Sequence, residues 1–284
     1  RMIMAGYEYE NKQPFKDVYF TGMVRDKQGR KMSKQLGNSP DLLGLIDTYG
    51  ADATRFGIMI ASPAGNDLLF DESSLEQGRN FNNKLWNALK LVKMWEGRKV
   101  ESSELKVESF AITWFENRLN EVKEEVDGLM KQFRLSEALK TIYSLIWDDF
   151  CSWYLEWVKP GFEQPIDASV YNKTVSFFEE LMQVLHPFMP FITEEIWQHL
   201  TGQKDWLVQV GWPKVPVSLN DAKATEEIEW LIKLITEVRA VRAEMNVPAA
   251  AQIPLIIQGA SPETISRVER HKPLILRLAR LSQL

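Results

Sequence analysis

Residues 29–38 read Gly-Arg-Lys-Met-Ser-Lys-Gln-Leu-Gly-Asn, a short basic segment with a glycine near each end. Gly29 and Gly37 tolerate backbone angles that other residues avoid, so the segment is predicted to be a loop. Before it, residues 17–24 are apolar, β-branched and aromatic, which predicts a buried strand. After it, Ser-Pro-Asp at 39–41 predicts a helix start, with the serine as N-cap and the proline at the first helical position. A strand, a mobile basic loop and a helix N-terminus form a good geometry for an anionic ligand.

Positive charge is concentrated around this loop. Residues 1–40 contain eight Lys or Arg and four Asp or Glu, a balance of +4, so the remaining residues carry −9 to give the chain's net −5. Positive potential at the loop suits a polyphosphate, whereas the net negative charge argues against a general nucleic-acid-binding surface. For a basic segment considered alone, a solvated surface loop is the simpler interpretation.

The amino-acid sequence of the loop favours its interpretation as an anion-binding site. Lys-Met-Ser-Lys-Gln at residues 31–35 resembles the KMSKS loop of class I aminoacyl-tRNA synthetases, with Gln35 in place of the usual serine. Further segments are similar to the valyl branch of that class: Asn-Ser-Pro-Asp at 38–41, Tyr-Gly-Ala-Asp-Ala at 49–53, Arg-Phe-Gly at 55–57, Ser-Pro-Ala-Gly-Asn-Asp at 62–67 and Gly-Arg-Asn-Phe-Asn-Asn-Lys-Leu-Trp-Asn-Ala at 78–88. Leucyl and isoleucyl relatives share the loop and the Tyr-Gly-Ala-Asp stretch but normally diverge in the Ser-Pro-Asp and Gly-Asn-Asp segments. The resemblance is dense over residues 1–95 and looser beyond.

The resemblance implies a role for the loop in amino-acid activation, in which a carboxylate attacks the α-phosphate of ATP and pyrophosphate leaves. Fixed cations aimed at the phosphate oxygens lower the barrier of such a reaction. Lys34 is expected to stabilise the triphosphate in the transition state, and Lys31 to position or close the loop. The residues expected at ATP are Lys31, Met32, Ser33 and Lys34, with the serine hydrogen-bonding within the loop. The amide of Gln35 still donates and accepts hydrogen bonds, so we expect altered loop packing without loss of activity.

The resemblance also implies parts that are not found among these residues. Class I synthetases carry a second signature, His-x-Gly-His, but the three histidines here, His186, His199 and His271, lack that spacing. We therefore expect the other half of the catalytic site, the valine pocket and the editing insert to lie outside this chain, and the chain alone to be inactive. For the full-length protein the implied activity is attachment of valine to tRNA(Val). Valine, ATP with Mg²⁺ and tRNA(Val) are the implied partners of a cytoplasmic monomer, and no bound metal is implied for this chain.

Helical periodicity dominates the rest of the sequence. Apolar residues recur every three or four positions, most clearly from Leu135 to Lys159. Helices are predicted at about 42–60 with a break at Tyr49-Gly50, at 71–95, 111–133, 135–159 and 168–185, in a shorter segment ending near 200, at 221–245, and from 261 onward. An extended strand or strap is predicted at 206–213 and an edge strand at 253–257. Four long amphipathic helices joined by short breaks predict an antiparallel bundle whose core contains the aromatic stripes.

The predicted fold is therefore mainly α. An antiparallel helix bundle of the anticodon-binding type is preceded by the tail end of a Rossmann-like α/β catalytic domain and followed by a small α+β piece. The expected divisions are residues 1–70, 71–215 and 216–284. Arg239 and Arg242, three residues apart and hence on one helix face, are expected on the helix that leads from the bundle to the C-terminal unit.

The resemblance places the anticodon end of a tRNA on the bundle, where splayed bases are recognised by stacking and by hydrogen bonds to their edges. It points to the polar face of the helix at 73–95, where the candidate RNA-binding residues are Arg79, Lys84, Lys90 and Lys93. On the pattern alone, ordinary solvation of a long helix is the simpler explanation of these side chains.

Cysteine usage and hydropathy exclude several classes of protein. Cys151 is the single cysteine, which excludes an intramolecular disulfide and fits a reducing cytosol. The scattered histidines and one cysteine show no metal-ligand spacing, and no run of eighteen apolar residues predicts a membrane span. Two alternatives stay open: a sister enzyme for isoleucine or leucine, and a non-catalytic RNA-binding or scaffold module derived from a synthetase.

Overall fold

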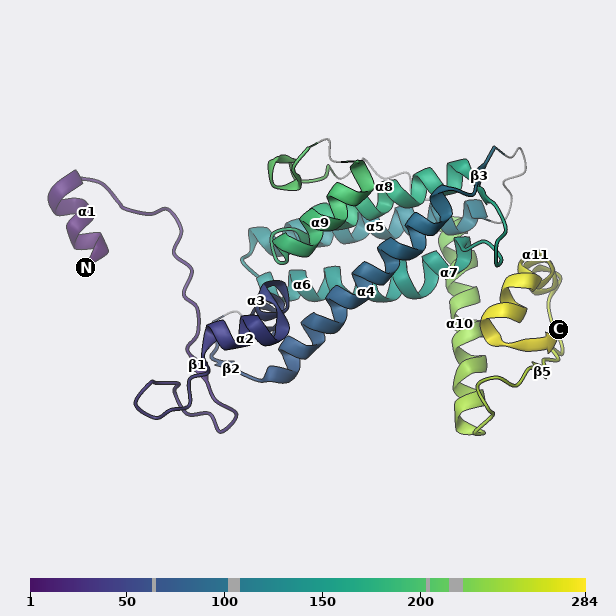
Figure 1. Cartoon of the computed structure of the whole chain (residues 1–284), viewed down its shortest axis with the longest axis horizontal. Helices are drawn as coiled ribbons and strands as arrows, with labels where there is room; N and C mark the ends of the chain where they lie inside the picture. The colour runs from purple at the N-terminus through teal and green to yellow at the C-terminus, as the bar shows by residue number, and fades with distance from the viewer. Residues whose placement is uncertain (63–64, 102–107, 203–204, 215–221) are drawn as a thin grey trace.

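The structure is a computed structural model that describes residues 1–62, 65–101, 108–202, 205–214 and 222–284. Figure 1 shows an extended N-terminal arm with helix α1 (Met2–Glu10) at its tip, a central body of long helices, and a compact C-terminal unit on the opposite side. The prediction of a mainly α fold with a helix bundle between two smaller parts is confirmed.

The bundle is built from helices whose apolar faces the sequence marks clearly. Its helices are α4 (Glu72–Glu96), α5 (Glu108–Lys131), α6 (Leu135–Ser144), the π-helix η1 (Leu145–Tyr154), α7 (Leu155–Val158), α8 (Ala168–Leu185) and α9 (Pro190–Thr201). Strand β3 (Lys99–Val100) follows α4 and pairs with β4 (Ile166–Asp167), which precedes α8. Because the end of α4 thus meets the start of α8, these two helices run antiparallel, as Figure 1 shows.

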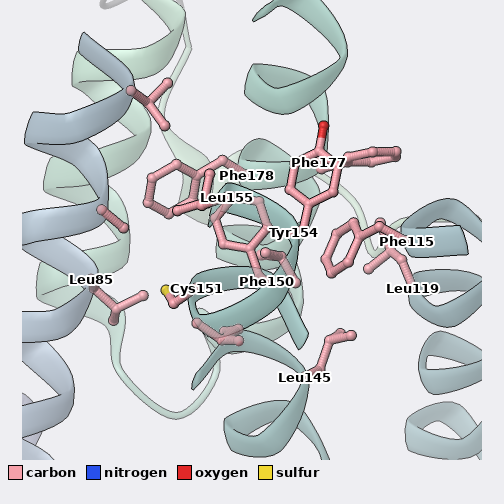
Figure 2. Packing of buried hydrophobic residues seen from close by; sticks show 14 of the residues in the cluster. Leu85, Phe115, Leu119, Leu145, Phe150, Cys151, Tyr154, Leu155, Phe177 and Phe178 are labelled. Atoms are coloured by element: carbon pink, nitrogen blue, oxygen red, sulfur yellow. The ribbon is translucent and has the colours of Figure 1, made fainter. Parts of the chain in front are cut away.

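Aromatic side chains fill the centre of the bundle, as predicted (Figure 2). The rings of Phe115 and Tyr154 lie 4.9 Å apart, and those of Phe150 and Phe178 lie 5.2 Å apart. Burial of such rings supplies much of the hydrophobic stabilisation of a helical bundle. The predicted single helix at 135–159 differs in one respect, because its middle ten residues, Leu145–Tyr154, form a π-helix. This wider helical turn still directs Phe150 and Tyr154 into the core, so an apolar pattern does not distinguish it from an α-helix.

The predicted buried strand at residues 17–24 is wrong. These residues are extended and largely exposed, including Phe20, whose side chain is 80% exposed. Only β1 (Val24–Arg25) forms a strand, pairing in parallel with β2 (Leu68–Leu69). A strand is buried only when neighbouring strands or helices cover it, and in the described residues the backbone partners of β1 are this short strand and residues 30–32 of the basic loop.

The helix start after the loop is shifted by two residues from the prediction. Helix α2 (Leu42–Tyr49) takes Asp41, not Ser39, as its N-cap, and Pro40 precedes the helix. The carboxylate of Asp41 accepts a hydrogen bond from the N–H of Gly44 at 3.1 Å, which satisfies a donor of the first turn. Helix α3 (Ala51–Ile60) follows directly, and the predicted break is confirmed at Gly50, whose φ of +91° favours glycine.

The extended segment predicted at 206–213 forms no strand and is interrupted. A 3₁₀ turn, η2 (Leu207–Gln209), occupies its first half, between extended backbone at Trp206 and Val210. The carboxylate of Glu194 on α9 accepts hydrogen bonds from the backbone N–H groups of Leu207 and Val208 at 2.9 and 3.2 Å. These bonds to a side chain take the place of a strand partner and turn the backbone instead.

The C-terminal unit is the predicted small α+β piece. Helix α10 (Ala222–Glu244) leads into it, strand β5 (Ile253–Pro254) pairs with β6 (Leu281–Gln283), and α11 (Pro262–Ala279) lies between them in sequence. The predicted start of α10 at Asp221 lies outside the described residues. Arg239 and Arg242 share one face of α10, as expected, and donate to the backbone carbonyls of Leu278 and Arg280, respectively.

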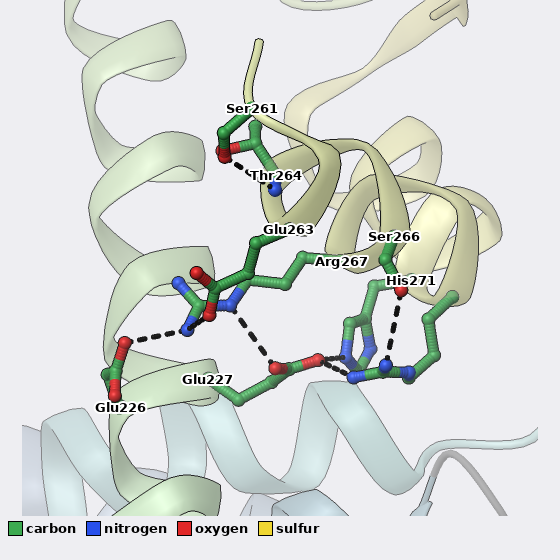
Figure 3. Close-up of polar contacts among 9 residues, drawn as sticks. Glu226, Glu227, Ser261, Glu263, Thr264, Ser266, Arg267 and His271 are labelled. Atoms are coloured by element: carbon green, nitrogen blue, oxygen red, sulfur yellow. Dashed lines mark hydrogen bonds and ion pairs between the residues drawn. The ribbon is translucent and has the colours of Figure 1, made fainter.

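A buried carboxylate anchors α11 to α10 (Figure 3). Glu227, whose side chain is 3% exposed, accepts from Nε2 of His271 at 3.0 Å and pairs with the guanidinium groups of Arg267 and Arg270. Burial works to raise the pKa of Glu227, but the hydrogen bond from His271 and the charge of Arg270 outweigh it and hold the pKa below its usual value. We call these four side chains the Glu227 cluster.

Candidate functional site

The basic loop begins as a tight backbone turn. Residues 24–26 run alongside residues 30–32, with the N–H of Met32 donating to Val24 O at 3.2 Å and the N–H of Asp26 donating to Arg30 O at 2.9 Å. Gly29, at φ +76°, closes the turn, and Gly37, at φ +63°, ends the loop. The prediction that these two glycines supply unusual backbone angles is confirmed.

Asp26 holds the base of the loop together. Its carboxylate accepts from the N–H groups of Gln28 and Arg30 at 3.0 and 2.9 Å, from Nε of Arg30 at 2.8 Å, and from Nδ2 of Asn38 at 3.0 Å. The Asn38 hydrogen bond is the largest influence on the pKa of Asp26, and together with the Arg30 and Gln28 donors it lowers that pKa to about 2. The carboxylate is therefore charged at neutral pH and ties the two ends of the loop to one point.

Asn38 and Ser33 organise the part of the loop that carries the two lysines. Oδ1 of Asn38 accepts from the N–H of Ser33 at 2.9 Å, and its Nδ2 also donates to Lys31 O at 3.3 Å. Ser33 Oγ in turn accepts from the N–H of Leu36 at 3.2 Å. The backbone on either side of Met32 is thus held from the far end of the loop. Neither Asp26 nor Asn38 was predicted as a site residue, although an Asp three residues before a turn glycine is a signal for such a turn.

The cations of this region fall into two groups. Arg25 pairs with Asp67, and Lys27 pairs with Asp71 at 3.1 Å. Arg30 pairs with Asp26 at 2.8 Å. Lys31 and Lys34 are exposed, and neither side chain has an ion pair or hydrogen bond within the described part of the chain. The two lysines that were predicted to bind ATP therefore have no anionic partner in the described residues.

The helix after the loop does not complete the expected anion site. Asp41 places its own carboxylate at the N-terminus of α2. A negative charge at this point occupies the free N–H groups that would otherwise attract an anion. An anion at this loop would be held by the lysine side chains and loop backbone, without the helix N-terminus.

Metal and thiol chemistry have no evident site in the ranges that the structure describes. No group of three His, Cys, Asp or Glu side chains in those ranges is placed to hold a metal ion. Cys151 is buried in the bundle, and burial raises the pKa of its thiol to about 12. The thiol is therefore protonated and unreactive at neutral pH.

The four candidate RNA-binding residues all lie on α4, but they do not form one open patch. Arg79 donates to Glu76 at 3.2 Å and stands over the ring of Tyr49 at 5.4 Å. Lys84 stands over the ring of Trp147 at 5.1 Å. At 100° per residue it lies about 140° around the helix from Arg79.

The other two candidates lie further along the same helix. Lys93 pairs with Glu96 at 2.6 Å and donates to His199 O at 3.4 Å. Lys90 is exposed and has no partner among the described residues. Three of the four candidates thus have partners within the protein, and Lys90 is the one whose charge is available among the described residues.

Comparison with known proteins places this architecture in a family. A family model described as the anticodon-binding domain of tRNA ligase matches residues 113–257, about half of the chain. The chain belongs to this family of tRNA ligases. A second family model, described as tRNA synthetases class I (I, L, M and V), matches residues 1–71, which include the basic loop.

Relatives named valine--tRNA ligase confirm the resemblance to the valyl branch. The one from Phocaeicola vulgatus is 49% identical over 285 residues, covering 100% of this chain and 32% of the relative. Those from Parabacteroides distasonis and Bacillus cereus are 50% and 39% identical, covering 94% and 100% of this chain and 31% and 33% of the relative. The chain thus spans about a third of the length of the curated relatives it matches.

A solved structure supports the fold at lower sequence identity. The LeuRS–tRNA–LeuAMS ternary complex from Agrobacterium radiobacter K84 matches with a TM-score of 0.56 and 21% identity over 79% of this chain and 26% of that one. In the residues that the structure describes, every helix is too short or too polar to cross a membrane.

Proposed function

We propose that this chain is the part of a valine--tRNA ligase that carries the ATP-phosphate loop and the anticodon-binding bundle. The whole enzyme would activate valine with ATP and transfer it to tRNA(Val). The observation that carries this proposal is the division of charge at the loop. Arg25, Lys27 and Arg30 are ion-paired, while Lys31 and Lys34 are exposed and have no side-chain partner among the described residues. The 49% identity of the whole chain to a ligase of this name supports the same proposal.

The loop residues would act on the phosphates of ATP. When the valine carboxylate attacks the α-phosphate, charge shifts onto the departing pyrophosphate, and a cation placed there stabilises the transition state. Lys34 would supply that cation, because a lysine is a flexible point charge that can follow the leaving group. Lys31 would hold the loop against the nucleotide, with Met32 and Ser33 between them, and Mg²⁺ would accompany ATP.

The bundle would hold the anticodon arm of the tRNA. On α4, Lys90 offers the available charge, and Arg79, Lys84 and Lys93 would need to exchange their present partners for RNA. The proposed division is a catalytic part at 1–70, the RNA-binding bundle at 71–215 and a C-terminal unit at 216–284. The monomeric state and the cytoplasmic location belong to the same proposal.

Substitution of the loop lysine in the full-length enzyme tests the proposal. Lys34→Ala should lower valine-dependent ATP–pyrophosphate exchange on the order of 10²–10³, the effect of removing one transition-state donor. Lys27→Ala is the matched control, since Lys27 lies in the same region but is paired with Asp71, and its exchange rate should stay within about twofold. Undiminished exchange by the Lys34 variant would refute the assigned role.

Two comparisons in the same assay separate the alternatives. Exchange that prefers isoleucine or leucine to valine would assign the chain to a sister enzyme. A full-length wild type that binds tRNA but catalyses no exchange with any of the three amino acids would establish the non-catalytic module.

A further inference from the structure

Helix α3 carries two oppositely charged side chains that both contact the corner between α8 and α9. Asp52 and Arg55 lie three residues apart, hence on neighbouring positions of one helix face. The carboxylate of Asp52 accepts from the N–H of Ile192 at 2.6 Å and from the N–H of Phe191 at 3.3 Å. The guanidinium of Arg55 donates to the carbonyls of Pro187 and Phe188 at 3.1 and 3.2 Å.

Asp52 acts as an N-cap supplied from a distant part of the chain. The residue at the N-cap position of α9 is Met189, whose side chain makes no capping hydrogen bond. Asp52, which is 4% exposed, takes that role with two free N–H groups of the first turn. Burial of a carboxylate is unfavourable by itself, but here the carboxylate fixes the position of α9 relative to α3. Its loss or displacement would leave two N–H groups of α9 without acceptors.

The remaining contacts of α3 are equally close. A Cβ added at Gly57 would lie 2.8 Å from the backbone of α4 at Leu75, and one added at Gly78 on α4 would lie 2.7 Å from Ala53 O. The two helices therefore touch backbone to backbone. At the C-terminal end of α3, the buried hydroxyl of Ser136 on α6 donates to Ile60 O at 2.7 Å. Helix α3 is thus held by α4, α6 and the α8–α9 corner at once.

Helix α3 is connected to the phosphate loop through α2 by short, hydrogen-bonded linkers. Three residues after the loop, Asp41 caps α2, and α2 passes to α3 through Gly50 alone. The N–H of Gly50 donates to Ile46 O at 2.8 Å, and the hydroxyl of Thr54 donates to Gly50 O at 2.9 Å, so the joint is hydrogen-bonded on both sides. In Figure 1, α2 and α3 lie between the loop and the bundle helices.

We infer that Asp52 and Arg55 are positioning residues that set the α8–α9 corner of the bundle relative to the phosphate loop. The inference rests on the proposed function, in which RNA is held by the bundle and activated amino acid is formed at the loop. Formation of the adenylate needs the loop but no RNA. Transfer to the RNA also needs the bundle to present the RNA end in register, and a displacement of about 1 Å lowers the rate of such a step strongly.

The experiment compares two reactions of the full-length enzyme. Asp52→Asn leaves one acceptor for two N–H donors, and Arg55→Gln removes the bidentate donor from an exposed side chain. Asp47→Asn is the matched control on the neighbouring helix, at an exposed carboxylate. Each variant is assayed for valine-dependent ATP–pyrophosphate exchange without RNA and for the kcat and KM of tRNA charging.

The expected result is a split between the two reactions. Exchange and the KM for tRNA should stay within about twofold, while the kcat of charging falls roughly tenfold in both variants and not in the control. A purely structural role would lower exchange and charging together, and a direct RNA contact would raise KM with kcat unchanged. Either outcome, or unchanged charging, overturns the inference.

Two further results keep the test decisive. If Asp52→Asn does not fold, the exposed Arg55→Gln variant alone must show the split. If the wild type itself neither exchanges nor charges valine, the proposed function fails and the inference fails with it, whereas an active wild type with unaffected variants overturns the inference alone.

Discussion

The basic loop and the Glu227 cluster each gather donors around one carboxylate, but they use their charges differently. At the loop, Asp26 accepts mainly from backbone and amide N–H groups and from one arginine. Lys31 and Lys34 have no side-chain partner in the part of the chain that the structure describes. In the cluster, Glu227 binds two arginines and a histidine in a buried site.

The difference separates a candidate ligand-binding site, the loop, from a joint between two helices, the Glu227 cluster. A network in which most donors to the carboxylate are neutral fixes the backbone while two nearby cations remain available to a ligand. A buried cluster in which each charge faces an opposite charge holds two elements together and has nothing left to bind an anion. The number of basic residues does not distinguish the two regions. Whether each cation has an acidic partner does.

The largest expected effect is loss of the joint. Glu227→Ala would leave two arginines and a histidine without their shared anion, and removing one partner of a buried ion pair costs about 3–5 kcal/mol. We expect the lower end of that range, because the Arg270 side chain is 36% exposed and can be solvated. Denaturant unfolding followed by circular dichroism measures the change.

Glu226→Ala is the matched control for this substitution. Glu226 pairs with the same Arg267 from a side chain that is 69% exposed, so its removal should change the free energy of unfolding by less than about 1 kcal/mol. Equal effects of the two substitutions would show that burial does not distinguish these carboxylates.

The next effect is on the loop and should appear in catalysis instead of stability. In the full-length enzyme, Asp26→Asn would remove the charge that fixes Asn38 and the turn backbone, leaving Lys34 present but less well placed. We expect ATP–pyrophosphate exchange to fall on the order of tenfold, less than for loss of Lys34 itself, because misplacement weakens a catalytic group without deleting it. The thermal unfolding midpoint should be unchanged, and a large drop in that midpoint would contradict the division into site and joint.

Acid should affect the two regions in sequence. Burial, opposed by Glu227, lowers the pKa of His271 below 6.5, so the unfolded chain takes up that proton first and stability at the junction declines as pH falls below 6.5. The pKa of Glu227 is also lowered, so a further loss follows below 4.5. The pKa of Asp26 is about 2 against an ordinary 3.8, so the loop network is complete above 3.8 and is lost only as pH falls from there towards 2.

Amide hydrogen exchange, corrected at each pH for the intrinsic rate, measures this order. Peptides from α11 should lose protection at a higher pH than those covering residues 26–38. Loss of loop protection first would mean that the Asp26 network is the weaker of the two.

Local signals allowed the sequence to predict much of this molecule. The bounds of α8, the break at Gly50 and the angles of Gly29 and Gly37 follow from periodicity and glycine chemistry within a few residues. The exposure of residues 17–24 could not be predicted in this way, because the burial of a segment depends on which other elements cover it.

The candidate site shows the same limit. The sequence selected Lys31 and Lys34 through a resemblance, but their freedom depends on acids elsewhere that pair with their neighbours. Asp67 and Asp71 follow Arg25 and Lys27 by more than forty residues. Likewise, the capping of α9 by Asp52 spans about 140 residues, so no local pattern shows it.

The smallest expected effect concerns Gln35, where the loop departs from its family pattern. Its side chain is exposed and makes no hydrogen bond with the described residues, whereas the backbone around it is fixed by Ser33 and Asn38. Because the network that orders the loop does not pass through this side chain, Gln35→Ser in the full-length enzyme should change ATP–pyrophosphate exchange by less than about twofold. A gain of tenfold would mean that the fifth position contributes to the closed loop on ATP, and would make the Asp26 network only part of what positions the two lysines.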